Sequence, residues 1–559
     1  MRFLLPLFAL LILGPLCLAP PLRAEEGQRT FPGGTCALKL PAEGEWSKAE
    51  IWAWTQICEG RWADMRKFSG DDQPCNPADI TDTVPEGRRL SPRFLRLILT
   101  HPQYTAALER PQVEVDCARI EGELDLENDA VAPELALLQS HLTAGATFLR
   151  SHFARSLIVQ GTQIDGKVSA SSLEVGGDLF LRDHTTVKGE LRLPGAKVGG
   201  NVSASGASFD GTVRADGIEV GGDLFLNDHT TVKGDLRLIG AKVGGDVAAI
   251  GASIKGKVRA DGIEVGGELF LREGAVFKQG IALTGARVGG NVHFGASTFA
   301  GRIELSGARV AGDLILSSSD IGRPNWGAEA SLILRNATAQ GFQAEIEAFQ
   351  RADGGWIDLD LAGFDYRTLG GLRAADRSSG RTNLADASAA QLIALIERRD
   401  AAGRPDPAHD AYFTPQPYRA LARALTEAGA LPQAEAVEEA RFEHERRAGN
   451  TPLRDRIWLW GSKLFIGYGL HPFRVLYWFA GLVGLGVALA YRSRELRHRN
   501  LVIKLMFSVE NALPLIEARA SFQSVRHGDA WVEGLFHAQK VAGFVLATVL
   551  VGALTLLGG

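Results

Sequence analysis

The sequence predicts a mainly β fold: a β-solenoid, or β-helix, of 11-residue half-coils with a helical N-terminal cap, a C-terminal helical hairpin and two transmembrane helices. Three observations lead to this fold class. Apolar residues recur at intervals of 11 or 12 along the middle of the chain. Glycine makes up 65 of the 559 residues, which is above ordinary usage, and it concentrates in this same region. Long apolar runs occupy both ends of the chain, although the mean hydropathy is +0.00.

The repeat over residues 119–337 defines the solenoid. Each unit reads apolar-x-Gly-x-apolar-x-apolar, followed by a turn rich in glycine, alanine and serine. Alternation with a period of two predicts short strands, in which residues such as Leu179 and Leu181 point inward. Because such units bury apolar side chains only by stacking, we expect coils of two units, or 22 to 23 residues. Three units per coil and a β-sandwich are the alternatives. The clearest anchors are Ile164, Val175, Val187, Val198, Phe209, Val220, Val232, Val243, Ile254, Val265, Phe277, Val288, Phe299 and Val310.

The first 24 residues have the layout of a secretory signal peptide. Arg2 supplies a basic start, an apolar run follows to Leu18, and Ala24 is a small residue at the expected cleavage site. An uncleaved anchor helix is the alternative. We therefore expect the rest of the N-terminal part to be exported.

Four cysteines lie in residues 25–118, which we expect to form a mainly helical N-terminal cap. An even number of cysteines in an exported segment predicts two disulfides, and their spacing leaves three connectivities open. Zinc is disfavoured because no CxxC spacing occurs and no histidine lies between the first and third of them, so we expect no metal site. The disulfide candidates are Cys36, Cys58, Cys75 and Cys117.

Helical patterns replace the repeat near its C-terminal end. Residues 338–456 are predicted to form a linker and a helical hairpin, with Gly429 at the break between the two helices. Residues 457–559 are predicted to form a membrane domain, with transmembrane helices at about 474–491 and 541–559. An exported solenoid would place the loop between these helices in the cytoplasm, with the protein in a bacterial inner (cytoplasmic) membrane and the solenoid in the periplasm or at the cell exterior.

Two further motifs belong to the predicted membrane domain. The small residues Gly484 and Ala488, and Gly543 and Ala547, are spaced as in helices that approach each other closely. The segment 465–469 reads like a potassium-channel filter, but it precedes the first helix. We interpret it as an interfacial turn that leads into the membrane.

A column of arginines is the candidate binding site. In a two-unit coil these residues fall one per coil on one face, where evenly spaced guanidinium groups suit an anionic polymer. The alternative is that neighbouring acids neutralise the column and the face is merely solvated. The four residues are Arg192, Arg214, Arg237 and Arg259. A second face carries a column of acids and amides, namely Asp178, Asn201, Asp223, Asp246, Glu268, Asn291 and Asp313.

The sequence favours a role other than catalysis. No HExxH, GxxxxGK[ST] or GxGxxG motif is present, so we expect no cofactor and no catalytic residue. The GGD triplets lack the full pattern of calcium-binding repeats. A net charge of −5 gives no case for nucleic-acid binding.

Several segments after about residue 90 carry recognisable motifs, namely Ser91–Thr100, the Gly-x-Leu-x-Leu units, Tyr418–Glu445, Gly467–Gly469 with Pro472, Arg474 and Trp478, and Asn511–Pro514 with Trp531 and Gly543. Together they resemble a family of bacterial membrane proteins, whose members are sometimes labelled membrane-associated oxidoreductase. The resemblance implies β-helical repeats and two C-terminal membrane helices, but it implies no catalytic residue. The signal peptide and the four-cysteine cap depart from the family, and no nucleotide, flavin, haem or dithiol motif supports an oxidoreductase.

These patterns together predict a membrane-anchored, exported solenoid that acts as a scaffold or binding protein of the bacterial cell envelope. Its expected partners are the lipid bilayer and an anionic envelope polysaccharide or an envelope protein. One alternative is a polysaccharide-active enzyme that uses a solenoid groove. Another is a transport or signalling role of the membrane domain.

Overall fold

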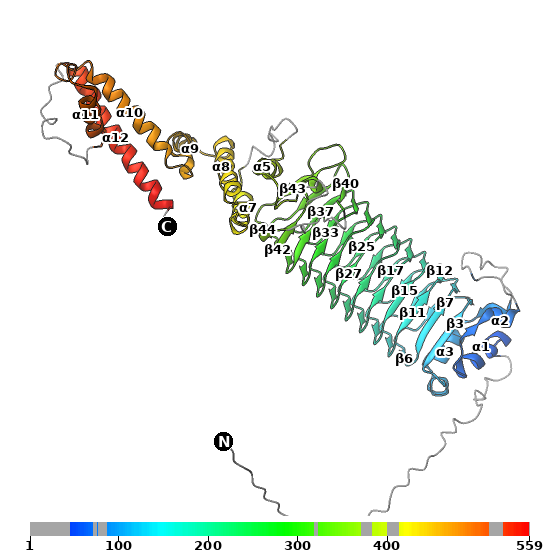
Figure 1. The fold of residues 1–559 in the computed structure, drawn as a ribbon. Coiled ribbons are helices and arrows are strands. Elements are labelled where there is room, and N and C mark those ends of the chain that lie inside the picture. Colours follow the sequence, from blue (N-terminus) through cyan, green and yellow to red (C-terminus); the bar gives the residue numbers. More distant parts are fainter. Residues whose placement is uncertain are drawn as a thin grey trace, which may run out of the picture.

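The computed structural model describes residues 45–70, 75, 86–317, 322–370, 383–399, 413–513 and 529–557. It shows a long parallel β-solenoid of about nine turns, with helices at both ends (Figure 1). The expected signal peptide, residues 1–24, lies outside the described residues. The predicted mainly β solenoid is confirmed.

Three parallel sheets run along the solenoid. Sheet A consists of β1 Ala63–Asp64, β3 Gln112–Asp116, β6 Ala130–Val131, β7 Glu134–Leu138, β10 His152–Phe153, β11 Leu157–Gln160, β14 Glu174–Val175, β15 Leu179–Arg182, β18 Lys197–Val198, β19 Val202–Ser203, β22 Glu219–Val220, β23 Leu224–Phe225, β26 Lys242–Val243, β27 Val247–Ala248, β30 Glu264–Val265, β31 Leu269–Phe270, β34 Arg287–Val288, β35 Val292–His293, β38 Arg309–Val310, β39 Asp313–Ile315, β42 Thr338–Gln343 and β44 Asp365–Leu369. Sheet B consists of β2 Arg89–Leu90, β4 Arg119–Ile120, β8 His141–Leu142, β12 Gln163–Ile164, β16 Thr186–Val187, β20 Ser208–Phe209, β24 Thr231–Val232, β28 Ser253–Ile254, β32 Val276–Phe277, β36 Thr298–Phe299 and β40 Asn325–Trp326. Sheet C consists of β5 Leu124–Asp125, β9 Ala146–Thr147, β13 Val168–Ser169, β17 Leu191–Arg192, β21 Val213–Arg214, β25 Leu236–Arg237, β29 Val258–Arg259, β33 Ile281–Ala282, β37 Arg302–Glu304, β41 Ser331–Ile333 and β43 Asp358–Asp360.

Strand register fixes the coil at two repeat units. Val175 pairs with Val198, and Val198 pairs with Val220, so partners in sheet A lie 23 and 22 residues apart. Each regular coil supplies two strands to sheet A, one to sheet B and one to sheet C. Alternate anchors of the sequence repeat therefore fall on sheets A and B, and the three-unit coil is excluded.

The core is a continuous column of side chains inside the coils. Leu179, Leu181 and Leu191 are buried, as their alternating pattern predicts. A row of aromatic rings crosses several coils in sheet B, where Phe277 stacks on Phe299 with ring centroids 5.3 Å apart. Each coil buries its apolar residues against its neighbours, so the stack is stabilised along its length.

The solenoid extends beyond both expected boundaries, 119 and 337. Strands β1, β2 and β3 already pair in sheets A and B on the N-terminal side, and β42, β43 and β44 continue sheets A and C to Leu369. The parallel ladders therefore include part of the segment expected to be a linker. The sequence repeat weakens before the coils end because the last coils keep buried apolar positions but not the glycine spacing.

Short helices close the N-terminal end, as expected for the cap. Helix α1 has a capping box in which Ser47 and Glu50 satisfy each other's backbone N–H groups. Trp54, Phe94 and Tyr104 pack as a cluster of rings between these helices. The helices are α1 Lys48–Cys58, α2 Met65–Ser69, α3 Pro92–Thr100 and α4 Pro102–Thr105, with the 3-10 helix η2 Glu86–Arg88.

A helical hairpin covers the C-terminal end. The hairpin forms as predicted, with Gly429 between its helices in the left-handed conformation, at φ 78°. Its first helix packs on β44, where Arg423 pairs with Asp365 and donates to the Tyr366 carbonyl oxygen at 3.1 Å. The elements are η3 Ile346–Phe349, α5 Ala389–Glu397, α7 Gln416–Glu427 and α8 Leu431–Arg447.

Four α-helices and the 3-10 helix η5 follow the hairpin within the described residues, and the last three α-helices pack into one unit. They are α9 Leu453–Ile466, η5 Gly467–Gly469, α10 Arg474–Ala490, α11 Leu501–Ala512 and α12 Ala530–Leu557. Helix α12 is long and apolar enough to cross a membrane over Ala530–Gly552, and α9 with α10 passes the same test as a pair bent by 113°. The apolar helix thus begins before the expected boundary at residue 541, whereas α10 matches the expected first span.

The predicted small-residue contacts between α10 and α12 are wrong in detail. Nothing lies within 4 Å of a Cβ built on Gly484, but one on Gly486 would overlap Ser508 and Gln539. A Cβ on Gly543 would overlap the carbonyl oxygen of Ala512, so Gly543 packs against α11 instead of α10. The intervening helix α11 was absent from the sequence-based expectation, and it changes which faces meet.

Candidate functional site

The predicted arginine column lies in register on sheet C. Arg192 pairs with Arg214, Arg214 with Arg237, and Arg237 with Arg259. Neighbouring parallel strands lie about 4.8 Å apart, so the Cα atoms of the four arginines repeat at about that interval. The structure therefore brings together all four residues that the sequence singled out.

Acids neutralise half of the arginine column. Arg214 lies 3.3 Å from a carboxylate oxygen of Glu190, and Arg237 lies 2.9 Å from Asp216. Arg192 and Arg259, at the two ends of the column, form no ion pair with any residue that the structure describes. The column is thus bounded by two guanidinium groups that are available to an anion.

A shallow trough on sheet A was not predicted. It encloses about 1310 Å³ and follows the first sheet A strand of successive coils. Each of these coils contributes a charged residue, a buried valine and an exposed glycine, except that Ala311 replaces the glycine after Val310. The charged residues alternate in sign from Glu174 to Arg287, and a second arginine, Arg309, follows. Arg287 contacts Glu264 at 2.6 Å, while Lys242 contacts Glu219 at 3.7 Å. The sequence pattern that marks this row is the charged residue directly before each anchor valine. The charged row is Glu174, Lys197, Glu219, Lys242, Glu264, Arg287 and Arg309.

The second predicted column, of acids and amides, serves the fold. The Asp178 carboxylate accepts the Asn201 backbone N–H at 2.7 Å, and the Asn201 side chain accepts the Asp223 N–H at 2.8 Å. Asp223 and Asp246 continue this ladder to the next coils, each at 2.7 Å. These side chains satisfy backbone donors where the chain turns, which explains the recurring GGD triplets as turn chemistry.

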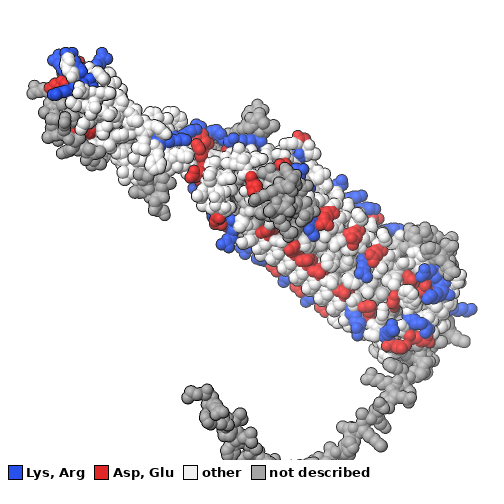
Figure 2. Space-filling view, in the orientation of Figure 1, with Lys and Arg blue, Asp and Glu red and all other residues white. Residues whose placement is uncertain are grey.

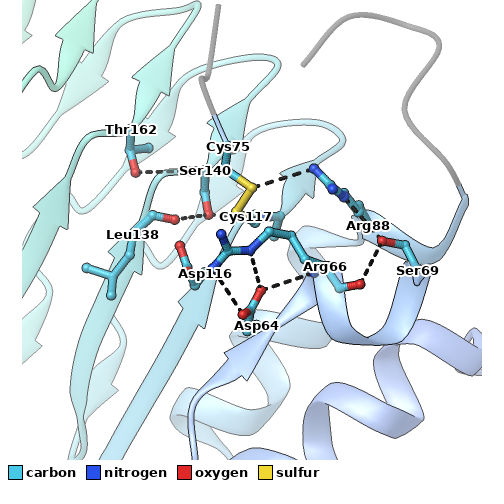
Figure 3. The surroundings of a disulfide bond; sticks show 11 residues. Asp64, Arg66, Ser69, Cys75, Arg88, Asp116, Cys117, Leu138, Ser140 and Thr162 are labelled. Atoms are coloured by element: carbon cyan, nitrogen blue, oxygen red, sulfur yellow. Dashed lines mark hydrogen bonds and ion pairs between the residues drawn. A yellow bond between two sulfur atoms is a disulfide. The ribbon is translucent and has the colours of Figure 1, made fainter. Parts of the chain in front are cut away.

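The cap contains one of the expected disulfides, between Cys75 and Cys117 (Figure 3). Their Cα atoms are 5.6 Å apart, and the Arg88 guanidinium donates to the Cys75 sulfur at 3.5 Å. Cys58 is also disulfide-bonded, whereas Cys36 lies outside the described residues. The pairing of Cys36 with Cys58 is the connectivity that the first disulfide leaves, and it stays a prediction.

Two acids beside this disulfide come close enough to suggest a metal site. Asp64, Asp116 and Cys117 offer atoms within 4.8 Å of one another, and Figure 3 shows Arg66 between the two carboxylates. The Cys117 sulfur is in a disulfide and offers no thiolate, while Arg66 contacts Asp64 at 2.9 Å and Asp116 at 3.3 Å. Burial and the nearby Asp64 charge raise the pKa of Asp116. The arginine takes the place that a cation would occupy, so the group is a buried ion pair of the cap.

A polar cavity of about 420 Å³ lies where the last coils meet the helical hairpin. Tyr418 and His444 line it, and the Tyr418 hydroxyl donates to Glu397 at 3.1 Å and contacts His444 Nδ1 at 2.8 Å. Burial and the Glu397 charge raise the pKa of Tyr418 strongly. This network fastens α5, α7 and α8 together beneath the cavity.

A second junction joins the hairpin to the apolar helices. Glu443 on α8 accepts hydrogen bonds from Lys463 on α9, from Arg446 at 2.8 Å and from the Tyr468 hydroxyl at 2.7 Å. The Tyr468 ring stacks on Phe442, with centroids 5.0 Å apart. Segment 465–469 therefore contains a turn that is docked on α8. Its place at a membrane interface stays a prediction.

We expect Glu443→Gln to weaken this junction by about 1–3 kcal/mol at neutral pH. Burial alone would raise the pKa of Glu443, but the hydrogen bonds from Lys463, Arg446 and Tyr468 outweigh burial and lower it to about 2. The stabilisation is therefore complete above the unfolded-state pKa of about 4.3 and disappears as the pH falls towards 2. Thermal unfolding of both proteins in detergent, between pH 7 and pH 2, should show two midpoints that converge below pH 4.

The matched control for this experiment is Glu435→Gln, which changes an exposed acid of the same helix. We expect that variant to unfold with the wild type at every pH. Equal effects of the two substitutions would contradict a specific role of Glu443.

Polar groups between α10, α11 and α12 bond to one another. Gln539 donates to the Leu482 carbonyl oxygen at 3.1 Å and to the Ser508 hydroxyl at 2.9 Å. Asn511 donates to the Phe536 carbonyl oxygen at 2.8 Å and to Gln539 at 3.0 Å. Interhelical hydrogen bonds of this kind hold the three helices together.

Comparison with known proteins identifies no relative: no family profile, no curated protein and no solved structure matches this chain at a significant level. The resemblance to bacterial β-helical membrane proteins stays a prediction.

Proposed function

We propose that this protein is a membrane-anchored, exported β-solenoid that serves as a scaffold or binding protein of the bacterial cell envelope. In this proposal sheet C contacts an anionic polymer, such as an acidic envelope polysaccharide. The observation that carries the proposal is the in-register arginine column on a rigid stack of coils. Four planar cations at a fixed interval can bind several anionic groups of one polymer chain at once.

The solenoid supports such binding because its coils order the column before the ligand arrives. Arg192 and Arg259 are available at the ends, while Glu190 and Asp216 orient the two central guanidinium groups. Multivalent contact of this kind raises the affinity, because once one anionic group is bound the next group of the same polymer binds at a high effective concentration. A loop bearing the same four residues would lose more entropy on binding.

Membrane anchorage is supported by the apolar helices at the C-terminal end. In Figure 2, acidic and basic residues are interspersed along the visible solenoid, whereas the α10–α12 unit is mostly free of charge and carries Lys and Arg at its far end. Basic residues between two spans favour the cytoplasmic side. Together with the signal-peptide pattern of residues 1–24, this arrangement would place the solenoid outside the inner membrane.

We expect replacement of all four arginines by serine to weaken binding to a purified anionic envelope polysaccharide by about tenfold or more. The trough offers a matched control, because serine at Lys197, Lys242, Arg287 and Arg309 removes the same charge from sheet A. Binding can be measured by sedimentation of the full chain in detergent across a series of salt concentrations. The arginine variant should also lose most of the salt dependence.

The control variant should bind within about twofold of the wild type, because its cations lie on another sheet. Equal losses in the two variants would mean that net charge, and not the column, attracts the polymer. Unchanged binding of the arginine variant would rule the column out as the site.

A further inference from the structure

Helix α9 turns its apolar side outward. Leu453, Ile457, Trp460 and Leu464 are spaced by four, three and four residues, so they form one stripe along the helix. The exposed apolar side chains of α9 are Leu453 (73%), Ile457 (64%), Trp458 (74%), Trp460 (59%), Leu464 (38%) and Phe465 (37%). A soluble protein rarely exposes a contiguous apolar face of this kind, which marks an interaction surface.

Two charged residues of α9, Arg456 and Lys463, face the protein, whereas Arg454 and Asp455 are exposed. Lys463 pairs with Glu443, and Arg456 donates to the Ala448 carbonyl oxygen at 2.5 Å. Leu459 on the same side is buried. The helix is therefore held on α8 by its polar side, while nothing among the described residues covers the apolar stripe.

The apolar stripe continues into α10 around a sharp corner. The two helix axes differ by 113°, so α9 lies nearly across the direction of α10. Phe465 contacts the ring of Trp478, with centroids 5.4 Å apart, and the Trp478 indole N–H donates to the Leu464 carbonyl oxygen at 3.0 Å. Tyr477, at the start of α10, is 80% exposed. Aromatic rings gathered where a span begins are typical of the boundary between headgroups and acyl chains.

We propose that α9 lies in the plane of the membrane, with its apolar stripe in the boundary between lipid headgroups and acyl chains. This inference rests on the proposed membrane anchorage, and it adds the orientation of α9 relative to the membrane plane. The occupant is lipid because the stripe is continuous with the exposed apolar surface of α10, and because the exposed residues Arg454 and Arg474 can pair with anionic headgroups. Arg454 lies near the edge of the stripe and can extend its charge towards water.

The experiment uses the full chain in vesicles of phosphatidylcholine and phosphatidylglycerol. Tryptophan fluorescence is quenched from the lipid side with lipids brominated near the top or the end of the acyl chain, and from the water side with iodide. The part of the signal that comes from α9 is the difference between the wild type and the double variant Trp458→Phe/Trp460→Phe. Trp62→Phe is the matched control, since Trp62 is 47% exposed in the cap at the far end of the molecule.

We expect the shallow-brominated lipid to quench the α9 signal at least about twofold more than either the deep-brominated lipid or iodide. The Trp62 signal should respond to iodide alone. An α9 signal quenched mainly by iodide would overturn the proposal, since the helix would then lie in water. An α9 signal that neither quencher reaches would also overturn it, because a protein surface, such as a second copy of the chain, would cover the stripe.

An alkaline wash separates this inference from the anchorage on which it rests. Release of the chain from the vesicles would overturn the anchorage and the placement of α9 together. Retention of the chain with iodide-accessible Trp458 and Trp460 would overturn the placement of α9 alone.

Discussion

Replacement of Gly266 by alanine should disrupt the solenoid at the coil that contains it. A Cβ atom at this position would overlap the carbonyl oxygen of Gly244 in the preceding coil, and backbone cannot move aside as a flexible side chain can. The same close approach recurs at Gly199 and Gly221, whereas the equivalent position holds an alanine in two other coils, at Ala154 and Ala311. Because alanine is accepted at the equivalent position of other coils, we expect a loss of about 1–3 kcal/mol, measured as a lower midpoint of thermal unfolding by circular dichroism of the full chain in detergent.

The control is Gly262→Asn, four residues away in the same coil. Gly262 has φ +66°, and nothing lies within 4 Å of its Cβ position. The equivalent turn of an earlier coil holds Ser172 at φ 55°, so a polar side chain is accepted there. Asparagine tolerates this backbone region, and we expect a cost below about 1 kcal/mol. Equal losses in the two variants would show that flexibility of glycine, and not close approach of backbones, decides its use at Gly266.

Replacement of Phe299 by alanine should have the second large effect. Phe299 is fully buried and packs on Phe277 at 5.3 Å, on Trp326 at 5.5 Å and on Phe294 at 5.6 Å between ring centroids. The substitution leaves a cavity within a row of rings that crosses several coils, and such changes typically cost 3–5 kcal/mol. The same thermal unfolding measurement applies.

Phe299→Leu keeps most of the buried volume, and we expect it to cost less than about 1.5 kcal/mol. Because each coil contacts only its neighbours, limited proteolysis of the alanine variant should begin near sheet B strands β32, β36 and β40. First cleavage in the N-terminal cap, or a leucine variant as unstable as the alanine variant, would contradict this account.

The coil could be predicted from the sequence because its determinants are local and repeated. Inward positions such as Val175 and Leu179 recur at the coil length, and the repeat carries the register with it. The arginine column could be predicted in the same way, because its residues recur at the length of one coil. The alternating charges of the trough were equally visible, for example at Glu174 and Lys197, but only the exposed glycine floor beside them shows that they border a hollow.

Contacts between separate elements could not be predicted in the same way. Gly262 and Gly266 look alike in the sequence, but they are needed for different reasons. Gly262 adopts a left-handed backbone conformation, whereas Gly266 lies close to the backbone of the preceding coil. Gly486, and not Gly484, lies at the close contact between helices because of how α10 is rotated against α11. Packing determines this rotation, and the sequence spacing does not show it. Glu443 gathers its partners from two further segments, and no spacing rule in the sequence connects them.

The alternation of 22- and 23-residue coils has a consequence for how such a molecule can change length. Two coils form one interchangeable block, so joining Glu219 directly to Val265 would remove a block and leave every ladder in phase. The height of the stack would fall by about 10 Å, and the alternation of charge would continue from Glu219 to Arg287. The number of two-coil blocks therefore sets the distance from the N-terminal cap to the C-terminal helices, in steps of one block. Blocks can be added or removed without changing the sequence of the others.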